Sequence, residues 1–364
     1  MQDLNLRKIK NLAKAGMQYA LKKEKLSSWP AVVKIDISPL CNLECLICVH
    51  ADPGSCSHLK RQIFHAKQRM PLEKYRNIIE EIKGKTCAVS LYFLGDPFMH
   101  PDLLEMCGIA KEAGLNVHIS TNFSYNFSDE KIERIARSGI THMTVCVDGI
   151  TQETYEKTRI KGSIQLVFSN LKRLCQYKAS HSLSCPEIEI QYIKFQHNLH
   201  ELDEAKKIFK AMGINYFYHF WGDLHNYSDI EPGKYRVYRY KSTKVIPQCL
   251  WPYFFMLIKY NGDVLPCCFY RVASQYSAEN PSTVIGNVFE KSVWEVWNSL
   301  KYQEIRRLVS SPGLSSKGKG LKETFCDGCY FLTLSDFEEI TRRADKYRFE
   351  DVYAIDKNGK AVRK

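Results

Sequence analysis

Residues 31–48 read AVVKIDISPLCNLECLIC, a run rich in β-branched residues followed by three cysteines. The run Ala31–Ile37 predicts a β-strand, because β-branched side chains fit a pleated, half-buried surface. Cys41, Cys45 and Cys48 then follow at the spacing C-x3-C-x2-C, on the loop that leaves the strand. Soft thiolates suit iron–sulfur clusters or zinc, so this stretch predicts a metal centre at the end of a strand.

Strand-like and helix-like segments alternate from this stretch to residue 220. The strand-like runs are Ala31–Ile37, Ala88–Phe93, Asn116–Ile119, His142–Val147, Ile188–Phe195 and Asn215–Phe220. The helix-like segments between them are Leu72–Lys83, Asp102–Ala113, Asp129–Ser138, Ile164–Tyr177 and Glu201–Met212. This alternation indicates right-handed βαβ units and a parallel sheet. Six units fit an α/β fold of the partial (β/α)6, TIM-like barrel type, although a doubly wound sheet would give the same pattern.

The alternation breaks near residue 222, where shorter elements begin and five further cysteines follow. The expected organisation has four parts: an N-terminal helix over 1–29, a partial barrel over 30–222, a small α+β domain over 240–340 and a tail over 341–364. The apolar residues on one face of the N-terminal helix are Leu4, Ile9, Leu12, Ala15, Ala20 and Leu21. We expect this helix to pack on the domain surface, and a helix lying on a membrane is the alternative.

Composition limits the class of protein. The chain has 364 residues, 14 cysteines and a formal net charge of +12. Its longest apolar run, Phe254–Ile258, is far shorter than the roughly 20 residues that span a bilayer, and residues 1–25 lack an export signal. We therefore expect a cytoplasmic protein without a membrane span, whose cysteines bind metal rather than form disulfides. The basic residues are spread along the chain and accompany no nucleic-acid motif, so no nucleic-acid partner is expected.

Four further motifs follow the later strands: Gly95-Asp96-Pro97, Ser120-Thr121-Asn122, Asp148-Gly149, and Arg159 shortly before Gly162. The first three come at carboxyl ends of predicted strands, the edge where β/α barrels place their sites. With the three cysteines, this series resembles the radical S-adenosylmethionine (radical SAM) superfamily. The sequence departs from the family pattern at Leu94 and Asp96, which replace a glycine and a glutamate, and at Ile47, which replaces an aromatic residue.

This resemblance implies a 4Fe–4S cluster on Cys41, Cys45 and Cys48, with an open iron that binds S-adenosylmethionine. Spacing alone also permits a zinc site completed by His50 or Cys56. The residues that the resemblance assigns to cofactor binding are Gly95, Asp96, Pro97, Ser120, Thr121, Asn122, Asp148 and Arg159. In the family, the bound cofactor is cleaved to methionine and a 5′-deoxyadenosyl radical.

The C-terminal cysteines are Cys249, Cys267, Cys268, Cys326 and Cys329. A hairpin signal at Asn261-Gly262-Asp263 predicts two strands, Phe254–Lys259 and Val264–Phe269, that bring Cys249 and Cys267 to one end. With the Cys326–Cys329 pair they supply four thiolates, and spacing alone leaves zinc and an iron–sulfur cluster equally open.

The same region resembles the SPASM/twitch extension of radical SAM enzymes, through the sequences IGNV at 285–288 and WEVW at 294–297. The resemblance implies one auxiliary 4Fe–4S cluster on Cys249, Cys267, Cys326 and Cys329, with Cys268 a spare thiol or an alternate ligand. The cysteine layout is most similar to 2-deoxy-scyllo-inosamine dehydrogenase and, more distantly, to anaerobic sulfatase-maturating enzymes.

A fully ligated auxiliary cluster suits electron removal from a substrate radical. The leading hypothesis is therefore dehydrogenation of a sugar- or cyclitol-like alcohol or of a peptide side chain, with a flavodoxin- or ferredoxin-type electron donor. The alternatives are a radical epimerase or a peptide cross-linking maturase, with Cys146 or Cys268 as hydrogen-atom donor, and, remotely, a non-catalytic zinc protein. The polar residues that follow the last two barrel strands and can reach a substrate are Gln191, Gln196, Asn198, His200, Trp221 and His225.

Overall fold

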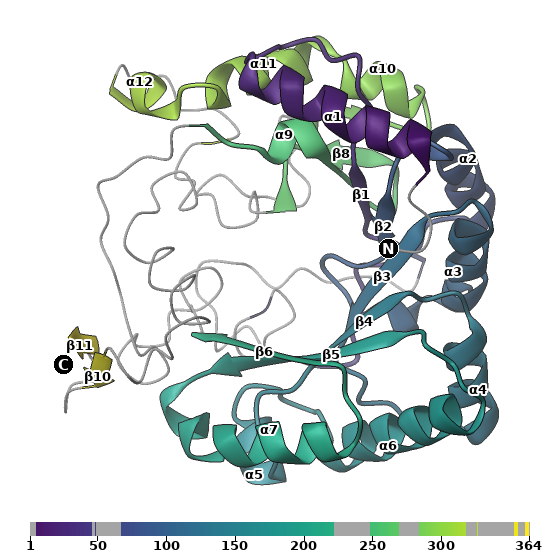
Figure 1. Ribbon diagram of the computed structural model, residues 1–364, viewed down its shortest axis with the longest axis vertical. Coiled ribbons are helices and arrows are strands. Elements are labelled where there is room, and N and C mark those ends of the chain that lie inside the picture. Colours follow the sequence, from purple (N-terminus) through teal and green to yellow (C-terminus); the bar gives the residue numbers. More distant parts are fainter. Residues whose placement is uncertain are drawn as a thin grey trace. The chain divides into compact units, whose positions relative to one another are not determined.

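The computed structural model describes residues 5–45, 48, 67–221, 248–268, 284–317, 326, 353–355 and 361–363. The chain divides into two compact units (Figure 1). Unit 1 comprises residues 1–40, 65–118 and 243–335, and unit 2 comprises residues 41–64, 119–242 and 336–364. The division falls inside strand β3 (Asn116–Thr121), whose first three residues belong to unit 1 and whose last three belong to unit 2.

Unit 1 is built on a sheet with the strand order β3-β2-β1-β7-β8-β9. Its further strands are β1 (Val32–Ile35), β2 (Ala88–Ser90), β7 (Phe255–Ile258), β8 (Asp263–Leu265) and β9 (Gly286–Asn287). Strands β2 and β7 both run parallel to β1, with Val33 opposite Val89 on one side and Met256 on the other. All three of these side chains are fully buried, so β1 is the centre of the sheet core.

The hairpin predicted in the C-terminal region is confirmed. Strands β7 and β8 pair antiparallel, with Leu257 opposite Leu265, and Gly262 between them has φ +87°. Glycine adopts this left-handed conformation without the steric cost that a Cβ would add. The parallel pairing of β7 with β1 was not predicted, because hydrophobic periodicity carries no information about which distant strand is the neighbour.

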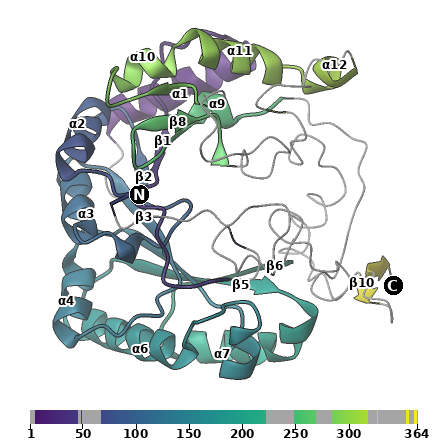
Figure 2. The same ribbon diagram turned by 180° about the vertical axis from the view of Figure 1, so that it is seen from behind.

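The helices of unit 1 cover this sheet. They are α1 (Leu6–Ala20), α2 (Leu72–Ile82), α3 (Leu103–Glu112), α9 (Trp251–Phe254), α10 (Val293–Trp297), α11 (Leu300–Val309) and α12 (Pro312–Lys317). In both views α1, α10 and α11 lie together (Figures 1 and 2). Buried Arg306 of α11 joins this group, since its Nη2 donates to Trp297 O at 2.7 Å and its Nη1 to Glu24 O at 2.8 Å.

The N-terminal helix differs from its prediction in length and orientation. It spans Leu6–Ala20, and Lys22 then takes a left-handed φ of 53°. The chain folds back because side chains of the helix bind it: Asn11 Oδ1 accepts from Trp29 N at 2.8 Å, and Gln18 Oε1 accepts from Ser28 N at 3.2 Å. The helix does pack on the surface, through a face that combines polar side chains with the buried Ala15, whereas Ile9 and Leu21 of the predicted apolar face are exposed.

Unit 2 contains strands in the order β6-β5-β4-β3. Its further strands are β4 (His142–Cys146), β5 (Glu187–Lys194) and β6 (Tyr216–Trp221), and its helices are α4 (Asp129–Arg137), α5 (Gln152–Glu156), α6 (Ile164–Ser180) and α7 (Leu202–Ala211). Strand β5 pairs parallel with both β4 and β6, and α6 and α7 lie on one side of these strands (Figure 2). A separate antiparallel pair is formed by β10 (Tyr353–Ile355) and β11 (Ala361–Arg363).

The predicted fold class is confirmed: the sheets are mostly parallel, strands alternate with helices, and each predicted strand and helix occurs. Gly114, Gly139 and Gly213 have positive φ directly after helices, as predicted. Helix α5 was not predicted, because its five residues are too few to show a helical period. Among the helices that the structure describes, none has both the length and the apolar character needed to cross a membrane.

Candidate cofactor and cluster site

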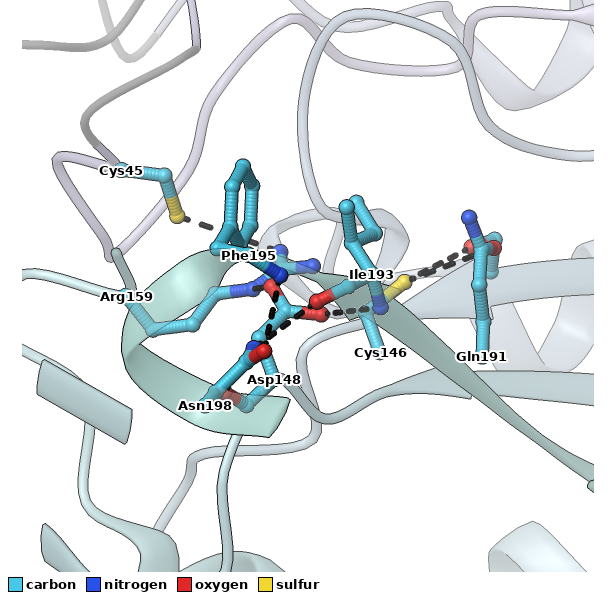
Figure 3. A network of polar contacts seen from close by, with 9 residues as sticks. Cys45, Cys146, Asp148, Arg159, Gln191, Ile193, Phe195 and Asn198 are labelled. Atoms are coloured by element: carbon cyan, nitrogen blue, oxygen red, sulfur yellow. Dashed lines mark hydrogen bonds and ion pairs between the residues drawn. The ribbon is translucent and has the colours of Figure 1, made fainter. Parts of the chain in front are cut away.

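A buried polar network in unit 2 follows strand β4 and centres on Asp148 (Figure 3). The Asp148 side chain is 1% exposed, and its Oδ1 accepts from Ile193 N at 2.9 Å. Asn198 Nδ2 donates to Asp148 O at 2.9 Å, while its Oδ1 accepts from Phe195 N at 2.8 Å. These bonds satisfy the polar groups of the loop that leaves β5 and hold the Asp148 carboxylate in one orientation.

Arg159 connects this network to the first cysteine motif. Its Nε donates to Asp148 Oδ2 at 2.6 Å, and its Nη1 donates to Cys45 Sγ at 3.9 Å (Figure 3). Burial alone would lower the pKa of Arg159, but the neighbouring Asp148 carboxylate, together with Cys45, Cys146 and Tyr155, outweighs this effect and raises the pKa well above its ordinary value. The guanidinium therefore stays charged beside the Cys45 sulfur.

The cysteine loop is also tied to the segment after Arg159 at two other points. Glu44 N donates to Ile160 O at 3.1 Å, and Lys161 Nζ forms an ion pair with Glu44 Oε1 at 2.7 Å. Lys161 itself has a positive φ of 69°. The backbone contact fixes the loop close to Arg159, whereas the ion pair is exposed and adds little to stability.

The turn after strand β3 holds the other end of the cysteine loop. Asn122 Nδ2 donates to Asn42 Oδ1 at 2.8 Å and lies 3.8 Å from Cys41 Sγ. Asn42 Nδ2 in turn donates to Ser124 O at 2.9 Å. Thr121 shapes the same turn, since its Oγ1 accepts from the amide of Phe123, which has φ +55°. The Ser-Thr-Asn turn thus positions the first cysteine.

The donor set around the cysteines fits an iron–sulfur cluster. Cys41 Sγ accepts from Leu43 N at 3.5 Å and from Asn122, and Cys45 Sγ accepts from Arg159. N–H bonds to thiolate sulfur are a means by which proteins tune such clusters. Burial raises the pKa of the Cys45 thiol, with partial relief from Arg159, so metal binding would have to supply the positive charge that stabilises a thiolate.

The described residues do not gather three or more histidine, cysteine, aspartate or glutamate side chains into a metal site. Ligation by Cys41, Cys45 and Cys48 therefore stays a prediction. Cys45 is buried and the other two are partly exposed, and Cys48 N donates to Cys45 O at 3.0 Å. His50 and Cys56, the alternative zinc ligands, lie outside the described residues, as does Ile47.

Cys146, the last residue of β4, lies beside the network. Its Sγ is 3.5 Å from Ser120 Oγ and donates to Gln191 Oε1 at 3.9 Å (Figure 3). The thiol is partly exposed. Strands β3, β4 and β5 of unit 2 thus each contribute one side chain to this group.

In unit 1, the Gly95-Asp96-Pro97 motif packs on the residues that lead to the first cysteine. A Cβ on Gly95 would lie 2.5 Å from Ser38 O and would overlap Leu40 O, so the backbones approach as closely as only glycine permits. Asp96 N donates to Leu40 O at 2.8 Å, and Asp96 Oδ1 accepts from Phe98 N at 3.0 Å. Asp96 is 4% exposed and caps the short helix η2 (Pro97–Met99).

The predicted auxiliary ligands are only partly described. Cys249, Cys267, Cys268 and Cys326 are partly exposed residues of unit 1, and Cys329 lies outside the described residues. Cys249 N donates to Val309 O at 3.0 Å, which fixes the start of α9 against α11. The auxiliary ligand set stays a prediction.

Sequence reasoning missed two residues of this site. Asn42 lies between cysteines on a loop, and only its contacts with Asn122 and Ser124 reveal its role. Glu44 was likewise not singled out. Asn198 was expected to be able to reach a substrate, but it is fully buried and structural. His225 of the same list lies outside the described residues.

Comparison with known proteins adds independent evidence. Residues 35–185 match the family model described as the radical SAM superfamily, and residues 249–330 match the SPASM model, described as an iron–sulfur cluster-binding domain. The chain thus carries a radical SAM domain followed by a SPASM domain. The cofactors that these two domains imply are 4Fe–4S clusters and S-adenosylmethionine.

Two curated relatives span most of this radical SAM chain. One is the tungsten-containing aldehyde ferredoxin oxidoreductase cofactor-modifying protein of Pyrococcus furiosus, 21% identical over 344 residues, or 84% of this chain and 89% of the relative. The other is the AdoMet-dependent heme synthase of Methanosarcina barkeri, 21% identical over 353 residues, or 84% of this chain and 92% of the relative. At this identity they leave the substrate of the radical SAM chain open.

Solved structures share its fold. Streptococcus suis SuiB bound to S-adenosylmethionine superposes with a TM-score of 0.60 at 17% identity, covering 82% of this chain and 72% of SuiB. Native anSMEcpe with bound AdoMet has a TM-score of 0.55 at 14% identity, covering 89% of this chain and 99% of that chain. Both support the radical SAM fold and carry no further conclusion about the reaction.

Proposed function

We propose that this enzyme binds a 4Fe–4S cluster through Cys41, Cys45 and Cys48 and S-adenosylmethionine beside it, and oxidises a C–H bond of its substrate. When bound, these groups would supply a 5′-deoxyadenosyl radical, which removes a hydrogen atom, and an auxiliary cluster, which takes up the remaining electron. With loss of a proton, an alcohol is thereby converted to a carbonyl. The auxiliary ligands in this proposal are Cys249, Cys267, Cys326 and Cys329.

The observation that carries the proposal is the position of Arg159 between the Asp148 carboxylate and the Cys45 sulfur. A fixed, largely buried cation at this point can serve in two ways. It offsets negative charge on a cluster held by thiolates, and its remaining N–H groups can bind the carboxylate of S-adenosylmethionine. Asp148 performs no proton transfer in this scheme; it orients the guanidinium.

The remaining predicted contacts have supporting roles. The resemblance to the family assigns the backbone of Gly95 and Asp96 to the cofactor amino group, and Asn122 holds the first cysteine. We place the enzyme in the cytoplasm, where a flavodoxin- or ferredoxin-type donor supplies the electron. The substrate class that we favour is a sugar- or cyclitol-like alcohol or a peptide side chain.

The test is anaerobic. Protein reconstituted with iron and sulfide is incubated with S-adenosylmethionine and a chemical reductant, and 5′-deoxyadenosine is quantified by chromatography. We expect the protein to contain iron and labile sulfide and to release 5′-deoxyadenosine. The Cys41→Ala variant should not release this nucleoside. Bound zinc without labile sulfide would instead identify a non-catalytic zinc protein. Incubation with metabolite and peptide pools, scored for added nucleoside, then identifies the substrate.

One observation favours a second function, a radical epimerase. The Cys146 thiol is on the last residue of β4, two residues before Asp148, and lies beside Ser120 Oγ and Gln191 Oε1, where it can return a hydrogen atom to a substrate radical. Solvent deuterium at the attacked carbon, absent from the product of Cys146→Ala, would support epimerisation. A carbonyl product with one 5′-deoxyadenosine per turnover would support dehydrogenation. Retention of all substrate hydrogens but two, with a new C–C or C–S bond, would indicate a cross-linking maturase.

A further inference from the structure

Helix α1 turns its polar residues inward. Lys8, Asn11 and Gln18 are at most 9% exposed, although amide and ammonium groups usually face water. Each has a partner in unit 1: Lys8 Nζ donates to Gly114 O, Asn11 Nδ2 donates to Trp29 O at 3.0 Å, and Gln18 Nε2 donates to Ser27 Oγ at 2.9 Å. Three anchors along one side fix the rotation of the helix about its axis.

The opposite face of α1 is apolar and exposed. The exposed fractions are 64% for Leu6, 46% for Ile9, 56% for Met17 and 60% for Leu21 just past the helix. With a helical repeat of about 100° per residue, these four side chains fall within one side of the helix, together with Ala13, Ala20 and the exposed Lys10. A stripe of large apolar side chains facing water marks a surface that binds something.

Positive charge accompanies this stripe. Arg7, Lys10 and Lys14 are exposed on α1, and Lys22 and Lys23 follow directly after it. The acidic residue within 5–25 is Glu24, whose carboxylate is occupied by Arg307 at 2.7 and 2.8 Å. The face therefore combines apolar side chains with a net positive border.

We propose that the outer face of α1 lies on an anionic lipid surface, with Leu6, Ile9, Met17 and Leu21 in the headgroup–acyl boundary. A basic amphipathic helix lying in the plane of the interface binds lipid through apolar burial and through attraction to anionic headgroups. A second copy of this chain is a worse occupant. In a symmetric dimer the same patch meets itself, which would bring the two sets of lysines together. Anionic headgroups neutralise them.

The charge argument leads directly to an experiment with the full-length chain. Co-sedimentation is measured with phosphatidylcholine vesicles and with vesicles that contain phosphatidylserine. We expect apparent binding at least about tenfold tighter to the phosphatidylserine vesicles, and most of it lost at high salt because the Debye length shortens. Equal binding to both vesicles, or none to either, would overturn the proposal.

Matched variants locate the surface. Met17→Glu/Leu21→Glu places two carboxylates on the outer face of α1, and we expect it to lower vesicle binding about tenfold or more. The control is Leu300→Glu/Leu314→Glu, which makes the same change at leucines that are 83% and 76% exposed on α11 and α12. Equal losses in both variants would contradict a site on α1.

Two measurements complete the test. Circular dichroism and thermal midpoints of the variants should match the parent chain, because the substituted side chains are exposed. Sedimentation velocity without vesicles should show the same species for the parent and for Met17→Glu/Leu21→Glu. Self-association that only the parent shows would identify a second copy as the occupant and overturn the lipid proposal.

Discussion

The two cysteine regions differ in how they are held. In unit 2, Cys41 and Cys45 are each joined to a strand end or a loop of the sheet by an N–H bond to sulfur, from Asn122 and Arg159. In unit 1, Cys249 is anchored through its backbone amide to Val309. The contacts described for the first region are N–H donors against the sulfurs, and the contact described for the second fixes the backbone.

This difference fits two kinds of metal centre. A cluster that binds and cleaves a cofactor needs its charge and orientation controlled from outside the ligand set, because both affect the reaction. A centre that only passes an electron needs complete ligation. The predictions below test this contrast, from the largest expected effect to the smallest.

Removing the cysteines of each region should abolish a different step of the reaction. Cys41→Ala/Cys45→Ala/Cys48→Ala should abolish reductive cleavage of S-adenosylmethionine, since no ligand for the first cluster remains. Cys249→Ala/Cys267→Ala should keep cleavage within about tenfold while losing substrate oxidation. The measurements are 5′-deoxyadenosine release and iron content, with Cys87→Ala as a control. Cleavage by the triple variant would refute the first site.

The close packing of Gly95 against the segment before Cys41 can be broken by a single substitution. Gly95→Ala would drive a Cβ into Ser38 O and Leu40 O, and we expect a loss of about 3 kcal/mol in the free energy of unfolding. Gly16→Ala is the control, because a Cβ there meets no atom within 4 Å and a helical alanine should stabilise by up to about 1 kcal/mol. Urea denaturation checks both. An unchanged Gly95→Ala variant would contradict the close approach.

The Arg159 contact should affect chemistry more than folding. Arg159→Met should lower the rate of S-adenosylmethionine cleavage about 10- to 100-fold and shift the electron paramagnetic resonance spectrum of the reduced cluster. Lys161→Met, which breaks the exposed ion pair with Glu44, is the matched control and should change neither by more than about twofold. An unshifted spectrum in Arg159→Met would show that the guanidinium does not act on the cluster.

Asn122 should give the smallest effect. Asn122→Ala removes bonds to Asn42 and to the Cys41 sulfur, so we expect about 1 kcal/mol of lost stability and a fewfold slower cleavage. At the start of the same strand, Asn116→Ala removes one side-chain hydrogen bond, to Cys87 O, and should leave the rate of S-adenosylmethionine cleavage unchanged. Equal rates in the two variants would show that the turn acts on folding alone.

Much of the fold could be predicted from sequence because its signals are local. Hydrophobic periodicity predicted each strand and the longer helices of residues 30–222, though not the five-residue α5, and Asn261-Gly262-Asp263 predicted the hairpin. The motifs also predicted that Asn122, Asp148 and Arg159 belong to one site, and all three lie in unit 2. The sequence left open whether the apolar face of α1 packs inward or lies on a membrane, since its orientation depends on hydrogen bonds that backbone amides after the helix donate to Asn11 and Gln18. Asn42 escaped prediction because its partners lie 80 or more residues away.

The place of β1 between β2 and β7 has a consequence for biosynthesis. β1 emerges from the ribosome early, yet the strand that covers its second edge is residues 255–258, which are made more than 200 residues later. Until then the apolar sequence VVKI presents an open edge, the kind of surface that recruits other nascent chains. The SPASM region therefore closes the sheet as well as carrying cysteines, and chains truncated before residue 255 should aggregate.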